Sequence, residues 1–333
     1  MTNEFRNLVF EGGGVKGVAY GGALKQLQAM GVLQKVRRVA GTSAGAIIGT
    51  LIAVGHDADE LTDILESTDY RQFQDPDWGD IREVWRFWRE FGWSKGEAFL
   101  KWIGDLIKDK TGDREITFGR LKVLQEQLGH ERIKELWTVG ANLTERRSEH
   151  FSWETTPKMP VRDAARVSMS LPFLFRSVRS RFKHDVLVDG GMLENYPLNI
   201  FDRRKFLFDK ANGDEVDYHP DLDYVFNHET LGFRLHTEKE YLFDTRGWGA
   251  DPPKIENIVE FSRSILNIVT EEEARTHLHE NDWNRTVYID ALGVRATDFH
   301  IDQAKVRALI HSGRVGVKRH FDWRNGPDGM TRP

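Results

Sequence analysis

The chain has 333 residues, of which 39% are hydrophobic and 30% are charged. This size and composition predict a sizeable core, in one large domain or two smaller ones. The formal net charge of −5 argues against binding nucleic acid through bulk positive charge. The sequence contains no cysteine, which excludes both a disulfide framework and a thiol nucleophile.

The N-terminal residues are polar and lead directly into the first predicted strand, with no apolar leader segment. The longest apolar helical run, residues 44–55, is about 12 residues long and too short to span a membrane. Together with the lack of cysteine, these features predict a soluble, cytoplasmic protein whose contact with membranes is peripheral.

Strands and helices are expected to alternate along much of the chain. Short buried strands are predicted at residues 7–10, 36–40, 137–142 and 186–188. Helices are predicted at residues 19–30, 44–54, 57–67 and 161–169, and Pro172 follows the last of them. This alternation predicts a three-layer α/β fold, in which helices cover both faces of a mostly parallel central sheet.

Residues 70–128 interrupt the alternation with a concentration of aromatic side chains. Five of the ten tryptophans lie here: Trp78, Trp85, Trp88, Trp93 and Trp102. Because arginines lie among them, we expect a helical, aromatic-rich cap or insertion that shapes a pocket or rests on a membrane surface. The alternative is a set of helices that pack their aromatic faces onto the sheet.

Residues 206–333 carry no motif that we can assign. A long helix is predicted at residues 255–279, a strand at 286–291 and a final helix at 302–320. These elements either complete the same domain or form a binding or regulatory appendage. His277 and His279 are two residues apart and do not share a helix face, so no metal site is expected there.

The pentapeptide Gly-Thr-Ser-Ala-Gly at residues 41–45 lies between a predicted strand and an apolar helix. In this context, Gly-x-Ser-x-Gly is typical of a nucleophile elbow, in which Gly41 and Gly45 permit a tight turn with Ser43 at its tip. The positive end of the following helix would favour negative charge that develops at Ser43.

A glycine-rich loop follows the first strand. Its consecutive Gly12, Gly13 and Gly14 provide backbone N–H groups that can converge on an anion. One interpretation is an oxyanion hole for acyl transfer. The other is a dinucleotide site, because Gly12, Gly14 and Gly17 have the Gly-x-Gly-x-x-Gly spacing. That site also needs an acidic residue on the next strand, where this chain has the elbow serine instead, so the oxyanion hole is favoured.

The third motif is Asp189-Gly190-Gly191, which follows the strand predicted at residues 186–188. A serine hydroxyl is a poor nucleophile until a base takes its proton, and Asp189 is a candidate for that base. An ordinary Asp-Gly-Gly turn is the alternative. All three motifs fall at the ends of predicted strands, where the active sites of parallel α/β sheets lie, and this favours the catalytic interpretation.

In their order and rough spacing, these motifs resemble those of the patatin-like phospholipase family. The matching segments are residues 11–17 for the oxyanion loop, residues 41–45 for the elbow, residues 189–191 for the catalytic aspartate, and Asn195 just beyond it. Glu11 departs from the pattern, because many members carry Asp at that place. The resemblance covers residues 6–205.

The resemblance implies a patatin-like catalytic domain with a Ser43–Asp189 dyad, which hydrolyses fatty-acyl esters of phospholipids as a phospholipase A does. Asp189 would take the proton of Ser43, and backbone N–H groups around Gly13 and Gly14 would hold the oxyanion. The residues implied for the oxyanion hole are Gly12, Gly13, Gly14, Val15 and Lys16. Those implied to support the motifs are Gly17, Gly41, Gly45, Gly190, Gly191 and Asn195.

Several alternatives remain open at this stage. Among enzymes, they are a lysophospholipase, a carboxylesterase, an acyltransferase and a nucleotide-binding oxidoreductase. From another class, the alternative is a catalytically silent module on the same fold that binds a lipid or a partner. The expected partners are an acyl-ester lipid and a membrane surface, without nucleic acid, metal or cofactor. Activation by a protein or small molecule is a hypothesis motivated by residues 206–333. The sequence gives no oligomeric state.

Overall fold

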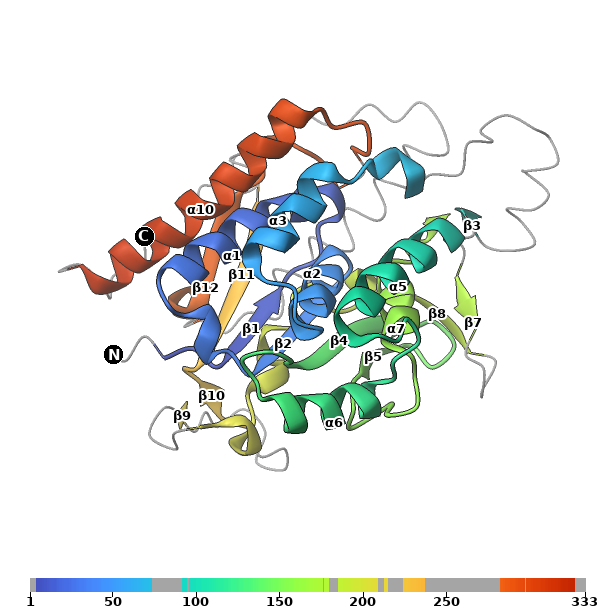
Figure 1. The fold of residues 1–333 in the computed structure, drawn as a ribbon, viewed down its shortest axis with the longest axis horizontal. Helices are drawn as coiled ribbons and strands as arrows, with labels where there is room; N and C mark the ends of the chain where they lie inside the picture. The colour runs from blue at the N-terminus through green and yellow to red at the C-terminus, as the bar shows by residue number, and fades with distance from the viewer. Residues whose placement is uncertain are drawn as a thin grey trace.

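The computed structural model describes residues 4–73, 92–94, 96–175, 177–179, 185–208, 213–214, 224–236, 282–296 and 298–326. Within these ranges, an eight-stranded central sheet lies between two covering layers, which confirms the predicted α/β fold (Figure 1). The strands of this sheet are β1 (Asn7–Phe10), β2 (Arg38–Thr42), β4 (Glu135–Asn142), β5 (Arg147–Phe151), β7 (Val178–Arg179), β8 (Val186–Asp189), β11 (Thr230–His236) and β12 (Thr286–Asp290).

The helices and minor strands lie around this sheet. The helices are α1 (Ala19–Ala29), α2 (Ala44–Ala53), α3 (Ala58–Ser67), α5 (Glu97–Thr111), α6 (Phe118–Leu128), α7 (Val161–Ser168) and α10 (Gln303–Asn325). The strands of two small sheets are β3 (Gly92–Ser94) with β6 (Phe173–Phe175), and β9 (Gly213–Asp214) with β10 (Phe226–Asn227). Among the described residues, no helix is both long and apolar enough to cross a membrane.

Five neighbouring strands of the central sheet run parallel, in the order β12-β11-β1-β2-β4. The remaining three strands join through antiparallel pairings: β5 and β8 each pair with β4, and β7 pairs with β8. The ends of β1 and β2 are level, with Phe10 opposite Gly41. The loops that follow these two strands therefore leave the sheet side by side.

β2 and β8 share one edge of β4. Thr42, the last residue of β2, is opposite Val139, and Asp189, the last residue of β8, is opposite Gly140. Both strands must lie on the same edge, because β5 occupies the other edge of β4 along residues 138–142. Since β2 and β8 run in opposite directions, their carboxyl ends meet beside the middle of β4.

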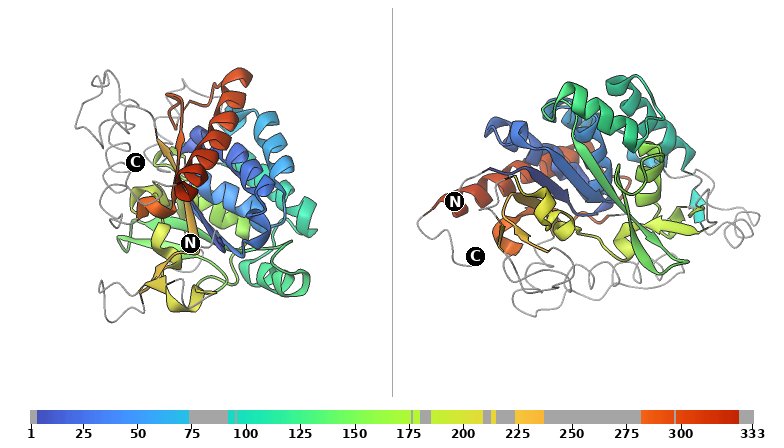
Figure 2. Two further views of the ribbon diagram at one scale, coloured as in Figure 1. Left: turned by 90° about the vertical axis from the view of Figure 1, so that its left-hand side faces the viewer. Right: turned by 90° about the horizontal axis from the view of Figure 1, so that it is seen from below.

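The side chains of the strands alternate between two apolar clusters, one on each face of the sheet. Leu8 and Phe10 of β1 belong to the larger cluster, which the helices cover. On this face α10 packs along α1, with α3 beside them (Figures 1 and 2). Val9 of β1 belongs to the second cluster, under the 3₁₀ turns Leu198–Phe201 and Arg204–Phe206.

Most predicted elements lie near their expected positions. The strand predicted at residues 286–291 is β12 and the final helix is α10, whereas β11 was not predicted. β11 and β12 extend the central sheet beyond β1, and α10 packs against α1. The helix predicted at residues 255–279 lies outside the described residues.

The described part of the expected cap contains two helices, α5 and α6. α5 buries Phe99, Ile103 and Ile107 in the larger apolar cluster and contacts α2 and α7. Trp102 packs against Phe99, with ring centroids 5.8 Å apart. α5 is therefore part of the core of the domain. Trp78, Trp85 and Trp88 lie outside the described residues.

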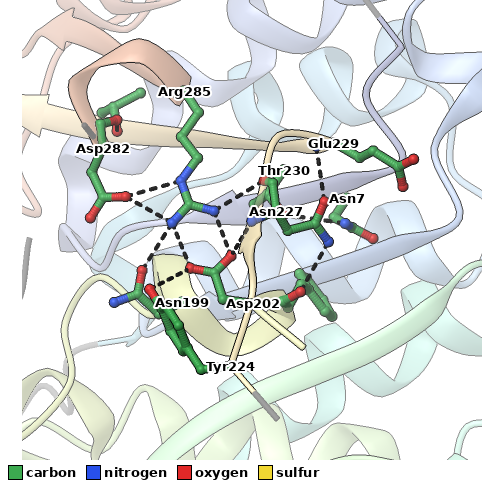
Figure 3. A network of polar contacts seen from close by, with 11 residues as sticks. Asn7, Asn199, Asp202, Tyr224, Asn227, Glu229, Thr230, Asp282 and Arg285 are labelled. Atoms are coloured by element: carbon green, nitrogen blue, oxygen red, sulfur yellow. Dashed lines mark hydrogen bonds and ion pairs between the residues drawn. The ribbon is translucent and has the colours of Figure 1, made fainter. Parts of the chain in front are cut away.

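A buried ionic network joins the second covering layer to the segment before β12 (Figure 3). Arg285 is 1% exposed and binds both oxygens of Asp202, each at 2.6 Å, and Asp282 Oδ1 at 2.7 Å. Asn199 Oδ1 and the Asn227 carbonyl also accept hydrogen bonds from this guanidinium. The two carboxylates raise the pKa of Arg285 further above its ordinary value although burial lowers it. One buried guanidinium thus binds two buried carboxylates directly.

We expect Arg285→Met to destabilise the fold by about 3–5 kcal/mol at neutral pH, because it removes the guanidinium that both buried carboxylates bind. Urea unfolding monitored by circular dichroism measures this loss. Arg71→Met is the matched control, since it removes an exposed pair with Asp69 and should leave the unfolding midpoint unchanged. Equal midpoints for the two variants would contradict a stabilising role of the network.

Candidate active site

Ser43 occupies a strained turn between β2 and α2. Its backbone has φ 53° and ψ −121°, a conformation that residues with a side chain rarely adopt and that occurs mostly at functional sites. The flanking glycines are required by close packing. A Cβ on Gly41 would lie 2.4 Å from the backbone of Gly45, and a Cβ on Gly45 would lie 2.2 Å from the Phe10 carbonyl. The geometry is that of a nucleophile elbow.

Asp189 lies at the end of β8 and is completely buried. Its Oδ1 accepts a hydrogen bond of 2.7 Å from the Gly191 N–H. Burial raises the pKa of this carboxyl to about 7, and the Gly191 N–H and the nearby Ser43 hydroxyl lower it only in part. Oδ2 has no hydrogen-bond partner among the described residues. Ser43 is therefore close enough to affect the carboxyl without forming a well-aligned hydrogen bond, as is common in ligand-free sites.

The glycine-rich loop has few free backbone donors. The N–H of Gly12 donates to the Asn195 carbonyl at 3.0 Å. Those of Val15 and Lys16 donate to the carbonyls of Ala296 and Gly13, at 3.0 and 3.1 Å. Each of these three N–H groups already has an acceptor in this conformation, so their contribution to an oxyanion hole stays a prediction.

The N–H groups of Gly13 and Gly14 have no acceptor among the described residues. The same holds for Ala44, the first residue of α2 and the one that follows Ser43. The N–H of the residue after the nucleophile is a common donor in oxyanion holes, although the sequence interpretation did not include it. Three backbone donors are therefore available, and two of their residues, Gly14 and Ala44, line the same pocket as Ser43.

Asn195 joins the glycine-rich loop to the loop after Asp189. Its carbonyl accepts the Gly12 N–H, and its Nδ2 donates to the Gly12 carbonyl at 3.3 Å. A Cβ on Gly12 would lie 2.3 Å from Asn195 Oδ1, and one on Gly191 would lie 2.9 Å from it. The glycines and the asparagine of these motifs thus fit one another.

Two further motif glycines are required by contacts with the elbow. A Cβ on Gly17 would lie 2.8 Å from the Cβ of Ala44, which begins α2. A Cβ on Gly190 would lie 2.5 Å from the Val139 carbonyl and 3.0 Å from Thr42. The absence of side chains at these glycines therefore lets the three motifs pack closely against one another.

An apolar pocket opens beside Ser43, with an empty volume of about 670 Å³ that includes space open to solvent. The residues that line it come from six parts of the chain: the glycine-rich loop, the elbow with α2, α3 with the turn after it, α5, the segment after α7, and the segment near residue 300. The aromatic members of this lining are Tyr70, Phe99, Trp102, Phe175 and Phe299. Such a pocket suits a hydrocarbon chain.

Segments near residue 300 also take part in the site, which the sequence did not indicate. The Ala296 carbonyl fixes the Val15 N–H, and a Cβ on Gly14, whose φ is +53°, would lie 2.1 Å from that carbonyl. Phe299 lines the pocket. Sequence patterns could not reveal these contacts, because they depend on the packing of a distant loop.

Glu11 anchors the start of the glycine-rich loop to β11. Its carboxylate accepts the Leu235 N–H at 2.7 Å and pairs with Arg234 at 3.3 Å. The carboxylate is buried and takes the place of a backbone acceptor where β1 leaves the sheet. An acidic side chain at this position therefore has a structural reason.

No histidine of the described residues lines the pocket beside Ser43. His150 on β5 instead binds Glu194 at 2.6 Å, and this hydrogen bond raises the pKa of His150 although burial lowers it. His184, His277 and His279 lie outside the described residues. Within the described ranges, no cluster of three or more His, Asp or Glu side chains could hold a metal ion.

Known proteins resemble this chain in sequence and fold. The protein YqhO of Bacillus subtilis is 28% identical over 92% of this chain and 94% of its own length. A probable lipid hydrolase, 463L of Invertebrate iridescent virus 6, is 28% identical over 59% of this chain and 63% of its own length. The crystal structure of VipD from Legionella pneumophila, at 18% identity, has a TM-score of 0.58 over 96% of this chain and 67% of that chain.

The family model for patatin-like phospholipases matches residues 8–202, which is more than half of the chain and contains all three motifs. The VipD likeness shows a shared fold, and the family match agrees with the elbow, the glycine-rich loop and the buried aspartate. The chain belongs to the patatin-like phospholipase family of ester hydrolases.

Proposed function

We propose that this protein is a serine lipid acyl hydrolase that cleaves fatty-acyl esters of phospholipids, with Ser43 as the nucleophile and Asp189 as its base. The observation that carries the proposal is the pair itself. The hydroxyl of a strained elbow lies near a buried carboxyl whose pKa is about 7 and whose Oδ2 has no hydrogen-bond partner in the described part of the chain. A base with a pKa near the working pH is well matched to proton transfer.

In the proposed reaction, Asp189 Oδ2 takes the proton as Ser43 Oγ attacks the ester carbonyl. The N–H groups of Gly13, Gly14 and Ala44 hold the oxyanion at the start of α2, where the helix dipole also favours negative charge. The leaving alcohol takes the proton from Asp189. Water, activated in the same way, then releases the fatty acid from the acyl-enzyme.

The pocket supports a lipid acyl chain as the substrate group. Its lining is almost entirely apolar, and Ser43 lies on its wall. Tyr70, Phe99 and Trp102 contribute to that lining, so we propose that residues 70–128 shape the pocket as a cap. The protein would then reach membrane lipids by binding peripherally to the membrane surface. Location in the cytoplasm and control by an activator stay predictions.

We also propose that residues 6–205 form the catalytic domain and that later elements complete it. β11 and β12 extend the same sheet, and Ala296 and Phe299 belong to the surroundings of Ser43. A C-terminal appendage that is independent of catalysis would lack these contacts.

Fatty-acid release from mixed phospholipid vesicles tests the proposed pair. We expect Ser43→Ala and Asp189→Asn each to reduce release by at least about 10³-fold, because a triad or dyad member acts as part of a unit. Ser67→Ala, at an exposed serine of α3, is the control and should keep full activity. Circular dichroism checks the folding of each variant.

Labelling with a fluorophosphonate separates the remaining alternatives. A silent binding module would show neither release nor labelling. A wild type that labels at Ser43 without releasing fatty acid would point to a different acyl ester or to a missing activator. Full activity of Asp189→Asn would assign the base to another residue.

The pH dependence of catalysis should report the Asp189 carboxyl. Because the base must be deprotonated, we expect kcat/KM to rise with pH and to level off above an apparent pKa of about 7. A soluble short-chain ester serves as the substrate, so that the ionisation of the lipid does not contribute. A flat profile between roughly pH 5 and pH 8 would contradict the assignment.

The same carboxyl should cost stability when it ionises. Its pKa in the folded state, about 7, lies above the ordinary value of 3.8, so wild type loses stability as the pH rises through this window. Asp189→Asn has no ionisable group at this position and does not lose this stability. The free energy of unfolding of Asp189→Asn relative to that of wild type should therefore rise by up to about 4 kcal/mol between pH 3.8 and about pH 7. Urea unfolding of both proteins at several pH values measures the difference. A difference that does not change with pH would exclude a raised pKa.

Phe299 should limit the length of the acyl chain. Its ring lines the pocket, so Phe299→Ala opens space into which further methylenes can be buried, each stabilising by about 0.8 kcal/mol. We expect kcat/KM to shift toward longer acyl groups across a series of p-nitrophenyl esters, with little change for the shortest ester. Val315→Ala, at an exposed apolar residue of α10, is the control. An unaltered chain-length profile would place the acyl group elsewhere.

A further inference from the structure

Ser168, the last residue of α7, lies directly behind the nucleophile elbow and is completely buried. Its hydroxyl accepts a hydrogen bond of 2.9 Å from the Ser43 N–H. The same hydroxyl donates to the Val139 carbonyl at 2.6 Å. Ser168 thus connects the backbone of the elbow to β4, and it lies outside the three sequence motifs.

These two bonds lie where β2 and β8 meet on the edge of β4. Val139 is the last residue of β4 that pairs with β2, and Gly140 is the first that pairs with β8, opposite Asp189. Two residues after Ser168, the Ser170 carbonyl accepts the Asp189 N–H at 3.0 Å. The segment after α7 therefore holds the backbones of both Ser43 and Asp189.

The elbow needs such support. Ser43 precedes α2, so its N–H has no acceptor within the helix. At φ 53° the backbone is strained, and a strained conformation persists only where surrounding contacts determine it. Without the Ser168 hydroxyl, the N–H of the strained residue Ser43 would lose its acceptor and the buried Val139 carbonyl would lose a donor.

We propose that Ser168 is a positioning residue of the active site: its hydroxyl fixes the elbow backbone so that Ser43 Oγ stays beside the Asp189 carboxyl. Ser168 acts through Ser43 and does not touch the substrate. This inference rests on the proposed function, since it assumes that Ser43 is the nucleophile.

Ser168→Ala tests the inference through the rate of fluorophosphonate labelling and through kcat and KM on a short-chain ester. We expect kcat and the labelling rate both to fall by about 10²-fold, because a misplacement of about 1 Å can have that effect. KM should stay within about twofold, since the pocket is unchanged. Ser168→Cys keeps the volume of the side chain but is a weak hydrogen-bonding group, so an intermediate loss is expected.

Thr62→Val is the matched control. The Thr62 hydroxyl is also buried and lies within bonding distance of two carbonyls, those of Ala58 at 2.7 Å and Gly21 at 3.3 Å. This variant should lose thermal stability while keeping kcat. All rates are measured at a temperature where circular dichroism shows the native fold, and Ser168→Cys keeps the test valid if the alanine variant does not fold.

The outcomes separate this inference from the function on which it depends. If wild type labels at Ser43 and the Ser168 variants label equally fast, Ser168 is only structural and the inference is wrong. If wild type itself does not label, the proposed nucleophile is wrong and the inference fails with it. A slow Ser168→Ala beside a fast Thr62→Val supports the inference.

Discussion

The active-site geometry depends on how β4 shares one of its edges. β2 pairs with the first part of that edge and β8, running the other way, pairs with the next part. Two strands that approach from opposite directions must end where they meet, and the chain turns away at each end. Ser43 follows the last residue of β2, and Asp189 is the last residue of β8. Ser43 and the Asp189 carboxyl are adjacent because β4 continues past both strand ends.

Backbone groups supply most of the remaining chemistry, and close packing decides which of them are free. The glycine-rich loop is fixed by Asn195, by Ala296 and through Glu11 by β11. These contacts occupy several N–H groups and leave those of Gly13 and Gly14 without acceptors among the residues that the structure describes. A loop with many glycines could adopt many conformations, and the surrounding contacts select one in which donors remain beside Ser43.

The protein treats its buried carboxylates in two different ways. Asp202 and Asp282 are matched by Arg285, so their charges are compensated and serve the fold. Asp189 is equally buried but has only the Gly191 N–H on one oxygen, and its pKa rises to about 7. Among the described residues no cation pairs with Asp189, and the raised pKa of its carboxyl agrees with the proposed role as a base.

The sequence by itself determined the three motifs, the α/β alternation and the family, because each of them depends on residues that are close together in the sequence or on the order of short motifs. Glycines mark tight turns, apolar runs mark buried strands, and the order of the motifs needs no folded structure to be read. The tertiary structure decided what depends on contacts between distant segments. It placed β8 antiparallel and end to end with β2, inserted the unpredicted β11 beside β1, and brought Ala296, Phe299 and Ser168 around the elbow. It also showed that Val15 and Lys16 donate elsewhere, since the partner of a backbone N–H is set by whichever acceptor packs against it and not by its own residue type.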